Sequence, residues 1–293
     1  MANLDLRPLS LGEILDRTFT LYRRNFLLFL GIAALPQSLL LAFRLAELTL
    51  ITFPVLTRTT KVPVEEFQSR GAQSGLMAFG LLGILLGAVL FLVVYVFSQG
   101  GTLFAVSDLY LGRPTSIRTA LGRMRGNAGN LFGVMVLSGL AILGSALLFI
   151  IPGIYVACRL LACIPAALLE DLGASDSLSR SFNLTKDYAG RAFMIYSIYF
   201  CILYGTVLLF AMPFAIASGV SIATNSELTK IWLILSQFGQ FVGAILATPV
   251  LTIATAVFYY DLRVRKEAFD LQMLMNPAGA QPTGTASVPT MLS

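Results

Sequence analysis

Long apolar runs, separated by short charged segments, restrict what this chain can fold into. Hydrophobic residues make up 57% of the 293 positions, whereas charged residues make up 12%. Soluble domains carry about twice that share of charge. A helix that crosses a bilayer needs roughly 20 mostly apolar residues, because lipid cannot hydrogen-bond to free backbone groups. Several runs reach this length, so the sequence predicts an all-α, polytopic membrane protein.

About six membrane helices are predicted, arranged as three helical hairpins in a single domain that covers residues 1–271. Their predicted ranges are 25–45, 76–110, 131–150, 154–169, 192–218 and 231–260. The turn between the third and fourth helices is assigned to Pro152 and Gly153, since proline ends a helix and glycine permits a turn. The arm at 152–170 is short, and it either spans the membrane or re-enters it from one side. Residues 272–293 are uncharged and rich in small residues, which predicts a disordered tail.

An amphipathic interfacial helix is predicted before each hairpin. In the first, residues 10–24, apolar side chains recur at three- and four-residue steps, and Ser10 with Glu13 forms a capping-box pattern. All three segments contain a Leu-x-Arg triplet, and the arginines of these triplets are Arg17, Arg123 and Arg180. Because the order of elements also repeats, we interpret the chain as three copies of one design.

Acidic residues recur near the end of the second helix of each hairpin. They are Asp108, Glu170 and Asp261. A helix C-terminus carries partial negative charge, so a carboxylate there is unfavourable unless a cation compensates it. The Leu-x-Arg arginines are expected at a similar depth, which predicts structural ion pairs between Arg17, Arg123 or Arg180 and some of these carboxylates. The alternative is that these charges are solvated at the interface and have no fixed partner.

Positive charge is unevenly divided between the two sides of the predicted bundle. With the N-terminus inside, fourteen of the twenty Lys and Arg residues fall in cytoplasmic segments and four fall in outer segments. Cytoplasmic loops are enriched in Lys and Arg, so both termini are expected in the cytoplasm. The net charge of +5 suits an anionic membrane surface, and no nucleic-acid partner is expected.

Arg159 is the candidate for a ligand or lipid contact, because ionisable residues inside a bilayer are costly and often functional. Two interpretations are open at this point. In the first, its side chain extends to the membrane interface or makes a structural hydrogen bond. In the second, it binds a lipid phosphate or an anionic solute. The chain has no histidine, and its three cysteines form no CxxC motif. No catalytic residue, metal site or cofactor is therefore predicted.

Three stretches of the sequence carry a resemblance to a known family. They are LRPLSLGEILDRTFTLYRRN at 6–25, PGIYVACR at 152–159 with Glu170 and LSRSFNL at 178–184, and FYYDLRVRKEAFD at 258–270. Together they resemble the glycerophosphoryl diester phosphodiesterase membrane domain family and related uncharacterised bacterial multipass proteins. The resemblance implies a six-helix domain in a bacterial cytoplasmic membrane. Some members of that family carry a separate catalytic barrel, but the resemblance here is to the membrane domain, so it implies no phosphodiesterase activity.

Two main functions are compatible with the sequence. The first is a non-enzymatic membrane module that binds a lipid or a partner in a lipid-related process. The alternative is a transporter or permease for a small or amphiphilic anionic solute, which would use a cavity near Arg159. An intramembrane enzyme is a third hypothesis, and the sequence contains no catalytic motif that supports it. The expected partners are membrane lipids, with a membrane protein or a second copy of the chain as further candidates.

Overall fold

The computed structural model describes residues 8–53, 70–110, 112–224 and 228–267. The regular elements among these residues are helices, and none of the described residues lies in a β-strand. Six helical stretches are long and apolar enough to cross a membrane. The predicted all-α polytopic fold is therefore confirmed. The predicted tail at 272–293 and residues 54–69 of the first predicted outer loop lie outside the described residues.

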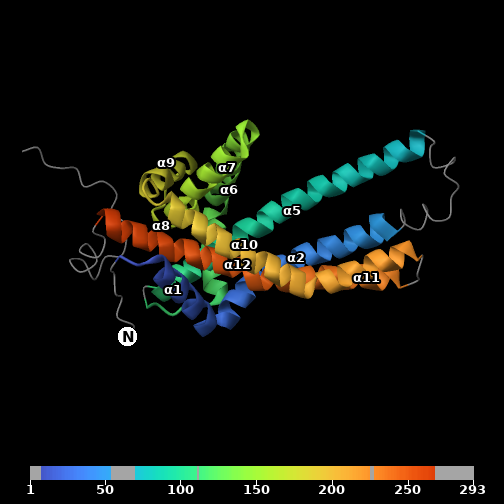
Figure 1. Cartoon of the computed structure of the whole chain (residues 1–293), viewed down its shortest axis with the longest axis horizontal. Coiled ribbons are helices and arrows are strands. Elements are labelled where there is room, and N and C mark those ends of the chain that lie inside the picture. Colours follow the sequence, from blue (N-terminus) through green and yellow to red (C-terminus); the bar gives the residue numbers. More distant parts are fainter. Residues whose placement is uncertain (1–7, 54–69, 111, 225–227, 268–293) are drawn as a thin grey trace, which may run out of the picture.

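The helices form hairpins around one long central helix. In chain order they are α1 (Leu11–Arg24), α2 (Phe26–Glu47), the π-helix η1 (Leu48–Thr52), α5 (Arg70–Tyr110), α6 (Ile117–Leu148), α7 (Ile150–Arg159), α8 (Cys163–Leu169), α9 (Ala174–Leu184), α10 (Ala189–Phe210), α11 (Met212–Ala223) and α12 (Thr229–Glu267). Consecutive elements pack as hairpins, α2 with α5, α6 with α7, and α10 and α11 with α12. Helix α12 runs through the middle of the molecule and contacts α1, α2 and α10 (Figure 1). At 1.5 Å per residue its 39 residues span about 58 Å, so it projects beyond a hydrocarbon layer of roughly 30 Å.

Helix α1 begins with the capping box that the sequence predicts. The Ser10 hydroxyl oxygen accepts a hydrogen bond from the backbone N–H of Glu13, and the Glu13 carboxylate accepts one from the backbone N–H of Ser10. Ile14 and Thr18 are buried on the inner face of this helix. The backbone leaves helical geometry at Asn25, which separates α1 from α2. The amphipathic helix therefore packs along the end of α12 (Figure 1).

The three amphipathic segments differ in how they join their hairpins. Helices α1 and α9 are separate elements, whereas the segment at 117–130 continues without a break into the membrane part of α6. The second hairpin thus departs from the prediction of a separate interfacial helix. The physical reason is that residues 117–148 contain no proline, so the backbone hydrogen bonds of α6 run uninterrupted.

The turn between α6 and α7 lies earlier than the sequence predicts. The break was expected at Pro152 and Gly153, but the backbone becomes extended at Phe149, and α7 begins directly after it. Pro152 lies in the first turn of α7, where its missing N–H removes no helical hydrogen bond. Gly153 instead permits close packing, because a Cβ atom there would lie 2.7 Å from the Ala146 Cβ and 2.9 Å from the Ala146 Cα.

Two further prolines divide helices that were predicted as single elements. The span predicted at 154–169 consists of α7 and α8, which are separated by a turn at 160–162. Pro165 lies in the first turn of α8, where a proline ring excludes the carbonyl four residues earlier from helical geometry. Pro213 likewise lies in the first turn of α11, so the helix predicted at 192–218 is α10 followed by α11.

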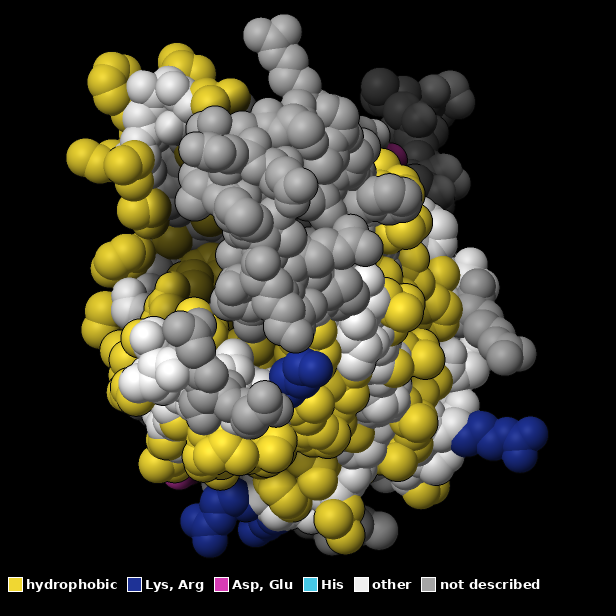
Figure 2. All heavy atoms as spheres, turned by 90° about the vertical axis from the view of Figure 1, so that its right-hand side faces the viewer, with side chains coloured by type: hydrophobic (Ala, Val, Ile, Leu, Met, Phe, Trp, Pro, Cys, Tyr) yellow, Lys and Arg dark blue, Asp and Glu magenta, His cyan; other side chains and the backbone are white. Residues whose placement is uncertain are grey.

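The outward surface of the bundle is strongly apolar. Large hydrophobic side chains are exposed on several helices, and Leu147 and Ile151, on either side of the turn between α6 and α7, are 87% and 80% exposed. Figure 2 shows hydrophobic side chains over much of the end of the molecule where α2 and α11 finish, with charged side chains at scattered places. Soluble monomers rarely expose apolar surface on this scale, so the surface suits a lipid solvent.

Candidate functional site

Charged side chains gather at the end of the bundle that carries α1 and the last turns of α12. Arg123 of α6 donates a hydrogen bond to Asp108, near the end of α5, with an Nη1–Oδ1 distance of 3.0 Å. The structure thus brings together two residues that the sequence analysis proposed as partners. The Arg123 side chain is 48% exposed, so solvent screens this pair and its contribution to stability is small.

Glu170, directly after α8, is the centre of a second cluster. Arg180 of α9 donates to both of its carboxylate oxygens, at 2.9 and 3.1 Å, and also to Glu267. The Tyr259 hydroxyl donates to Glu170 as well, and the Arg263 guanidinium lies 3.8 Å away. Burial lowers the pKa of Arg180, but its hydrogen bonds and charge attraction to Glu170 and then Glu267 outweigh burial, so the pKa lies above its usual value. This cluster ties α8 and α9 to the end of α12.

Asp261 is a buried carboxylate whose side chain has no exposed area. Arg265, one helical turn further on, lies 2.9 Å from it, and Arg191 of α10 lies 3.5 Å from it. The backbone N–H of Leu9 donates to Asp261 at 2.6 Å, and the Leu9 carbonyl oxygen accepts hydrogen bonds from both arginines. The residue that precedes the cap of α1 is thereby held on α12. The sequence analysis missed Arg191 and Leu9, because a backbone group and a distant arginine leave no local pattern.

Arg17 contacts a tyrosine at the end of α5. Its guanidinium donates to the Tyr110 hydroxyl at 3.2 Å. The Tyr110 ring stacks on Tyr260 with 4.8 Å between the centroids, and the Tyr260 and Ser107 hydroxyls lie 3.0 Å apart. Arg17 therefore joins α1 to the end of α5 through an aromatic stack.

Arg159 is buried at the end of α7 and donates to groups of the protein. Its Nε donates to the Thr185 hydroxyl at 3.2 Å, its Nη1 donates to the Tyr155 hydroxyl at 2.8 Å, and its Nη2 donates to the Phe182 carbonyl oxygen. Its own backbone carbonyl accepts from the hydroxyls of Ser181 and Thr185. These contacts fasten the end of α7 to α9, and they account for a buried arginine as a structural hydrogen-bonding group.

The acidic residues described at this end of the bundle are engaged by arginines. Among the described residues, no group of three or more His, Cys, Asp and Glu side chains is placed to hold a metal ion. The carboxylates of Asp108, Glu170 and Asp261 accept hydrogen bonds from arginines instead. We therefore interpret them as groups that hold the helices together.

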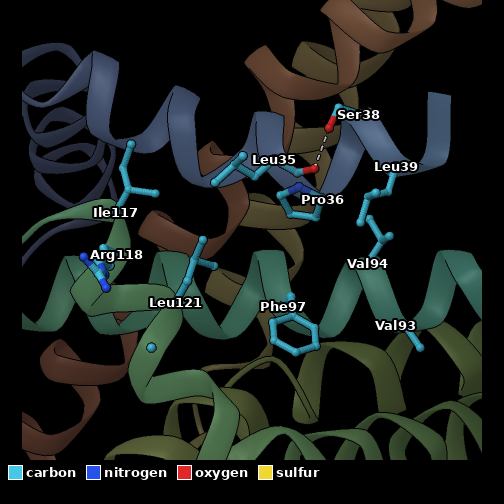
Figure 3. A pocket seen from close by; sticks show the side chains of 11 residues that line it. Leu35, Pro36, Ser38, Leu39, Val93, Val94, Phe97, Ile117, Arg118 and Leu121 are labelled. Carbon is cyan, nitrogen blue, oxygen red and sulfur yellow. Dashed lines mark hydrogen bonds between the residues drawn. The ribbon is translucent and has the colours of Figure 1, made fainter. Parts of the chain in front are cut away.

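An apolar groove with a volume of about 920 Å³ opens between α2, α5 and the start of α6. Its walls are formed by Leu35, Pro36, Ser38, Leu39, Val93, Val94, Phe97, Ile117, Arg118, Leu121 and Gly122. Leu39 of α2 and Val94 of α5 point toward one another, and the first turns of α6 lie at one end (Figure 3). Ser38 donates its hydroxyl hydrogen to the Leu35 carbonyl at 2.7 Å, so its polar group is used within the wall. The volume is near the upper end of the roughly 300–1,000 Å³ that small-molecule sites occupy.

Close helix contacts bound this groove on both sides. Toward α6, a Cβ atom on Gly101 would lie 3.2 Å from the Ile32 side chain. On the other side, a Cβ atom on Gly87 would lie 3.0 Å from the Phe43 ring. Pro36 lies inside α2 between these two contacts, and it removes a backbone hydrogen bond and favours a bend there. Helices α2 and α5 therefore pack closely at Gly101 and at Gly87, on either side of the stretch that lines the groove.

Arg118 is the charged residue in the lining of this groove. Its side chain is exposed and makes no hydrogen bond or ion pair within the described part of the chain. The sequence analysis counted Arg118 only as one of many cationic residues, because nothing in the sequence indicates that the start of α6 lies against α2 and α5.

The fold is that of a multi-pass α-helical membrane protein. Arginine–carboxylate contacts join its hairpins at one end, and an apolar groove lies between its first hairpin and α6. Comparisons with protein-family models, with curated proteins and with solved structures give no match.

Proposed function

We propose that this chain is a non-enzymatic integral membrane module that binds a membrane lipid in the groove between α2, α5 and α6. The observation that carries this proposal is the groove itself, with about 920 Å³ of space between walls that are almost entirely apolar. Leu35, Leu39 and Val93 of these walls are exposed in the protein alone. A groove of this kind within the lipid phase suits an acyl chain, which packs against apolar walls and requires no hydrogen bonds from them.

Transport of an anionic solute past Arg159 has less support. Three N–H groups of this guanidinium already donate to Thr185, Tyr155 and Phe182, so a solute would have to displace protein contacts. The groove that the structure does contain has walls suited to hydrocarbon and not to a hydrated ion. Binding of lipid is therefore the function that the geometry supports best.

The proposal is tested by filling the groove. A Cβ atom on Gly122, which lines the groove, would meet nothing within 4 Å, so Gly122→Phe adds a side chain at the groove without a backbone clash and its ring fills groove space. The matched control is Gly129→Phe, at a glycine of the same helix that is equally open but does not line the groove. Native mass spectrometry of the detergent-purified protein should show bound lipid in the wild type and in Gly129→Phe, and much less in Gly122→Phe. Equal lipid in all three proteins, or none in the wild type, would contradict the proposal.

We also propose that the protein resides in a bacterial cytoplasmic membrane with both termini in the cytoplasm. The support is the fourteen-to-four distribution of Lys and Arg. The contact between Leu9 and Asp261, which puts both described ends of the chain at one end of the bundle, agrees with an even number of crossings. A fluorescent reporter fused after Arg113 should be active, and a phosphatase reporter fused at the same position should be inactive. The reverse result would overturn the orientation and leave the bundle intact.

A relationship to the glycerophosphoryl diester phosphodiesterase membrane domain family remains part of this proposal. Its support is the set of three sequence stretches, at 6–25, 152–184 and 258–270. These stretches include Leu9, Arg180 and Asp261, which lie in the charge clusters at one end of the bundle. The proposed partners are membrane lipids, and a membrane protein or a second copy of the chain would cover apolar surface outside the groove.

A further inference from the structure

We propose that the groove selects an anionic phospholipid, with an acyl chain between α2 and α5 and its phosphate beside Arg118. This inference rests on the proposed function and adds the class of lipid and the direction in which it lies. The groove has two chemically different parts. Its long walls are apolar, and its end at the first turns of α6 carries a guanidinium (Figure 3). An amphiphile with a hydrocarbon tail and an anionic head matches both parts.

The state of Arg118 supports an anionic partner. Arg123, Arg180 and Arg265 form ion pairs with carboxylates at the same end of the bundle. Arg118 makes no hydrogen bond or ion pair within the described part of the chain. Its planar guanidinium offers five donors in a fork that matches two oxygens of a phosphate. A lipid phosphate would supply the charge-assisted hydrogen bonds that the protein does not.

The position of Arg118 sets the orientation of the lipid. It lies in the first turn of α6, two residues after the cap Ser116, and this segment precedes the membrane part of the helix. The groove extends from there along α5 toward Val93 and along α2 toward Leu39. A lipid with its phosphate at Arg118 therefore has its head in the leaflet nearest α1 and its tail directed toward the membrane centre.

A net anionic head is favoured over a zwitterionic one at this place. Both kinds of lipid contain a phosphate, but a choline group carries a positive charge that Arg118 repels. Attraction between one Lys or Arg and anionic lipid at a membrane surface is about 1 kcal/mol, which corresponds to roughly fivefold in affinity. We therefore expect the wild type to retain phosphatidylglycerol about fivefold more strongly than phosphatidylcholine with the same acyl chains.

The test compares retention of these two lipids by the full chain in mixed nanodiscs, followed by native mass spectrometry. Arg118→Gln should lose the roughly fivefold preference and still retain lipid, because the apolar walls are unchanged. Arg118→Lys should keep part of the preference, since it keeps the charge but loses the fork. The matched control is Arg113→Gln, which removes the same charge from an exposed arginine that does not line the groove and should behave as the wild type.

The other outcomes would contradict the lipid preference, the Arg118 site or the proposed function. If the wild type retains both lipids equally, the inference fails and the proposed function stands. If the wild type retains no lipid, both fail. If Arg113→Gln lowers the preference as much as Arg118→Gln, the effect belongs to general surface charge and the Arg118 site is wrong. If added glycerol phosphate displaces phosphatidylglycerol, the site recognises a free phosphate and not a lipid.

Discussion

Replacement of Asp261 by alanine is expected to destabilise the protein more than any other single change in its charge clusters. The Asp261 carboxylate is fully buried and accepts hydrogen bonds from Arg265 at 2.9 Å and from the Leu9 backbone N–H at 2.6 Å. Arg191 lies 3.5 Å from it. Without the carboxylate, two guanidinium groups remain close together with no counter-charge, and the Leu9 N–H loses its acceptor. Removal of one partner from a buried pair costs about 3–5 kcal/mol.

The effect is measured as the thermal unfolding midpoint of the detergent-solubilised protein. Asp187→Ala serves as the control, because Asp187 is exposed and its ion pair with Lys266 has an N–O distance of 3.6 Å. Exposed pairs contribute about 0–1 kcal/mol, so this variant should unfold close to the wild-type midpoint. If the two variants unfold at the same temperature, Asp261 does not hold α1 and α10 to α12.

Gly239→Ala is expected to separate α12 from the junction of α10 and α11. A Cβ atom on Gly239 would lie 2.1 Å from the Phe210 carbonyl oxygen and 2.8 Å from the Ala211 Cα. Both atoms belong to the backbone, so no side-chain rotation relieves the contact, and a helix has to move. Overpacking of this kind costs about 1–3 kcal/mol, and the expected result is a lower unfolding midpoint and a lower yield of monodisperse protein.

The control for this substitution is Gly219→Ala in α11. A Cβ atom at Gly219 would meet nothing within 4 Å, so alanine adds no clash there. Alanine is also favoured over glycine within a helix by about 0.5–1 kcal/mol, so Gly219→Ala should unfold at the wild-type temperature or above it. A Gly239→Ala protein as stable as Gly219→Ala would show that α12 does not pack closely on the break after Phe210.

Part of the charge arrangement followed from local sequence, and part did not. The capping box of Ser10 and Glu13 is set within one turn of helix, so spacing alone indicates it. The pairing of Arg180 with Glu170 joins residues ten positions apart across one tight connection, which a pattern of helix ends can suggest. The pairing of Asp261 with Arg191 depends on α10 packing against α12, and no spacing in the sequence encodes that contact.

Proline positions show the same division. The sequence assigns a helix break to Pro152 and Gly153, because proline lacks an N–H and its ring excludes one carbonyl, but it predicts continuous helices across Pro165 and Pro213. It does not indicate on which side of the proline the break falls. In each case the proline lies in the first turn of the next helix, so the break precedes it. Because the turn between α6 and α7 lies at Phe149, Gly153 of α7 comes to lie close to Ala146 of α6.

The sequence by itself determined that this protein is a bundle of about six lipid-length helices with acidic residues near helix ends. Those properties follow from apolar run length and from charges at helix termini, and each is complete within one segment of chain. Only the tertiary structure decided which arginine meets which carboxylate, and that α2, α5 and the start of α6 enclose a groove lined by Pro36 and Arg118. Packing decides these features because they join residues on different helices, and hydropathy carries no information about how two apolar helices tilt and touch.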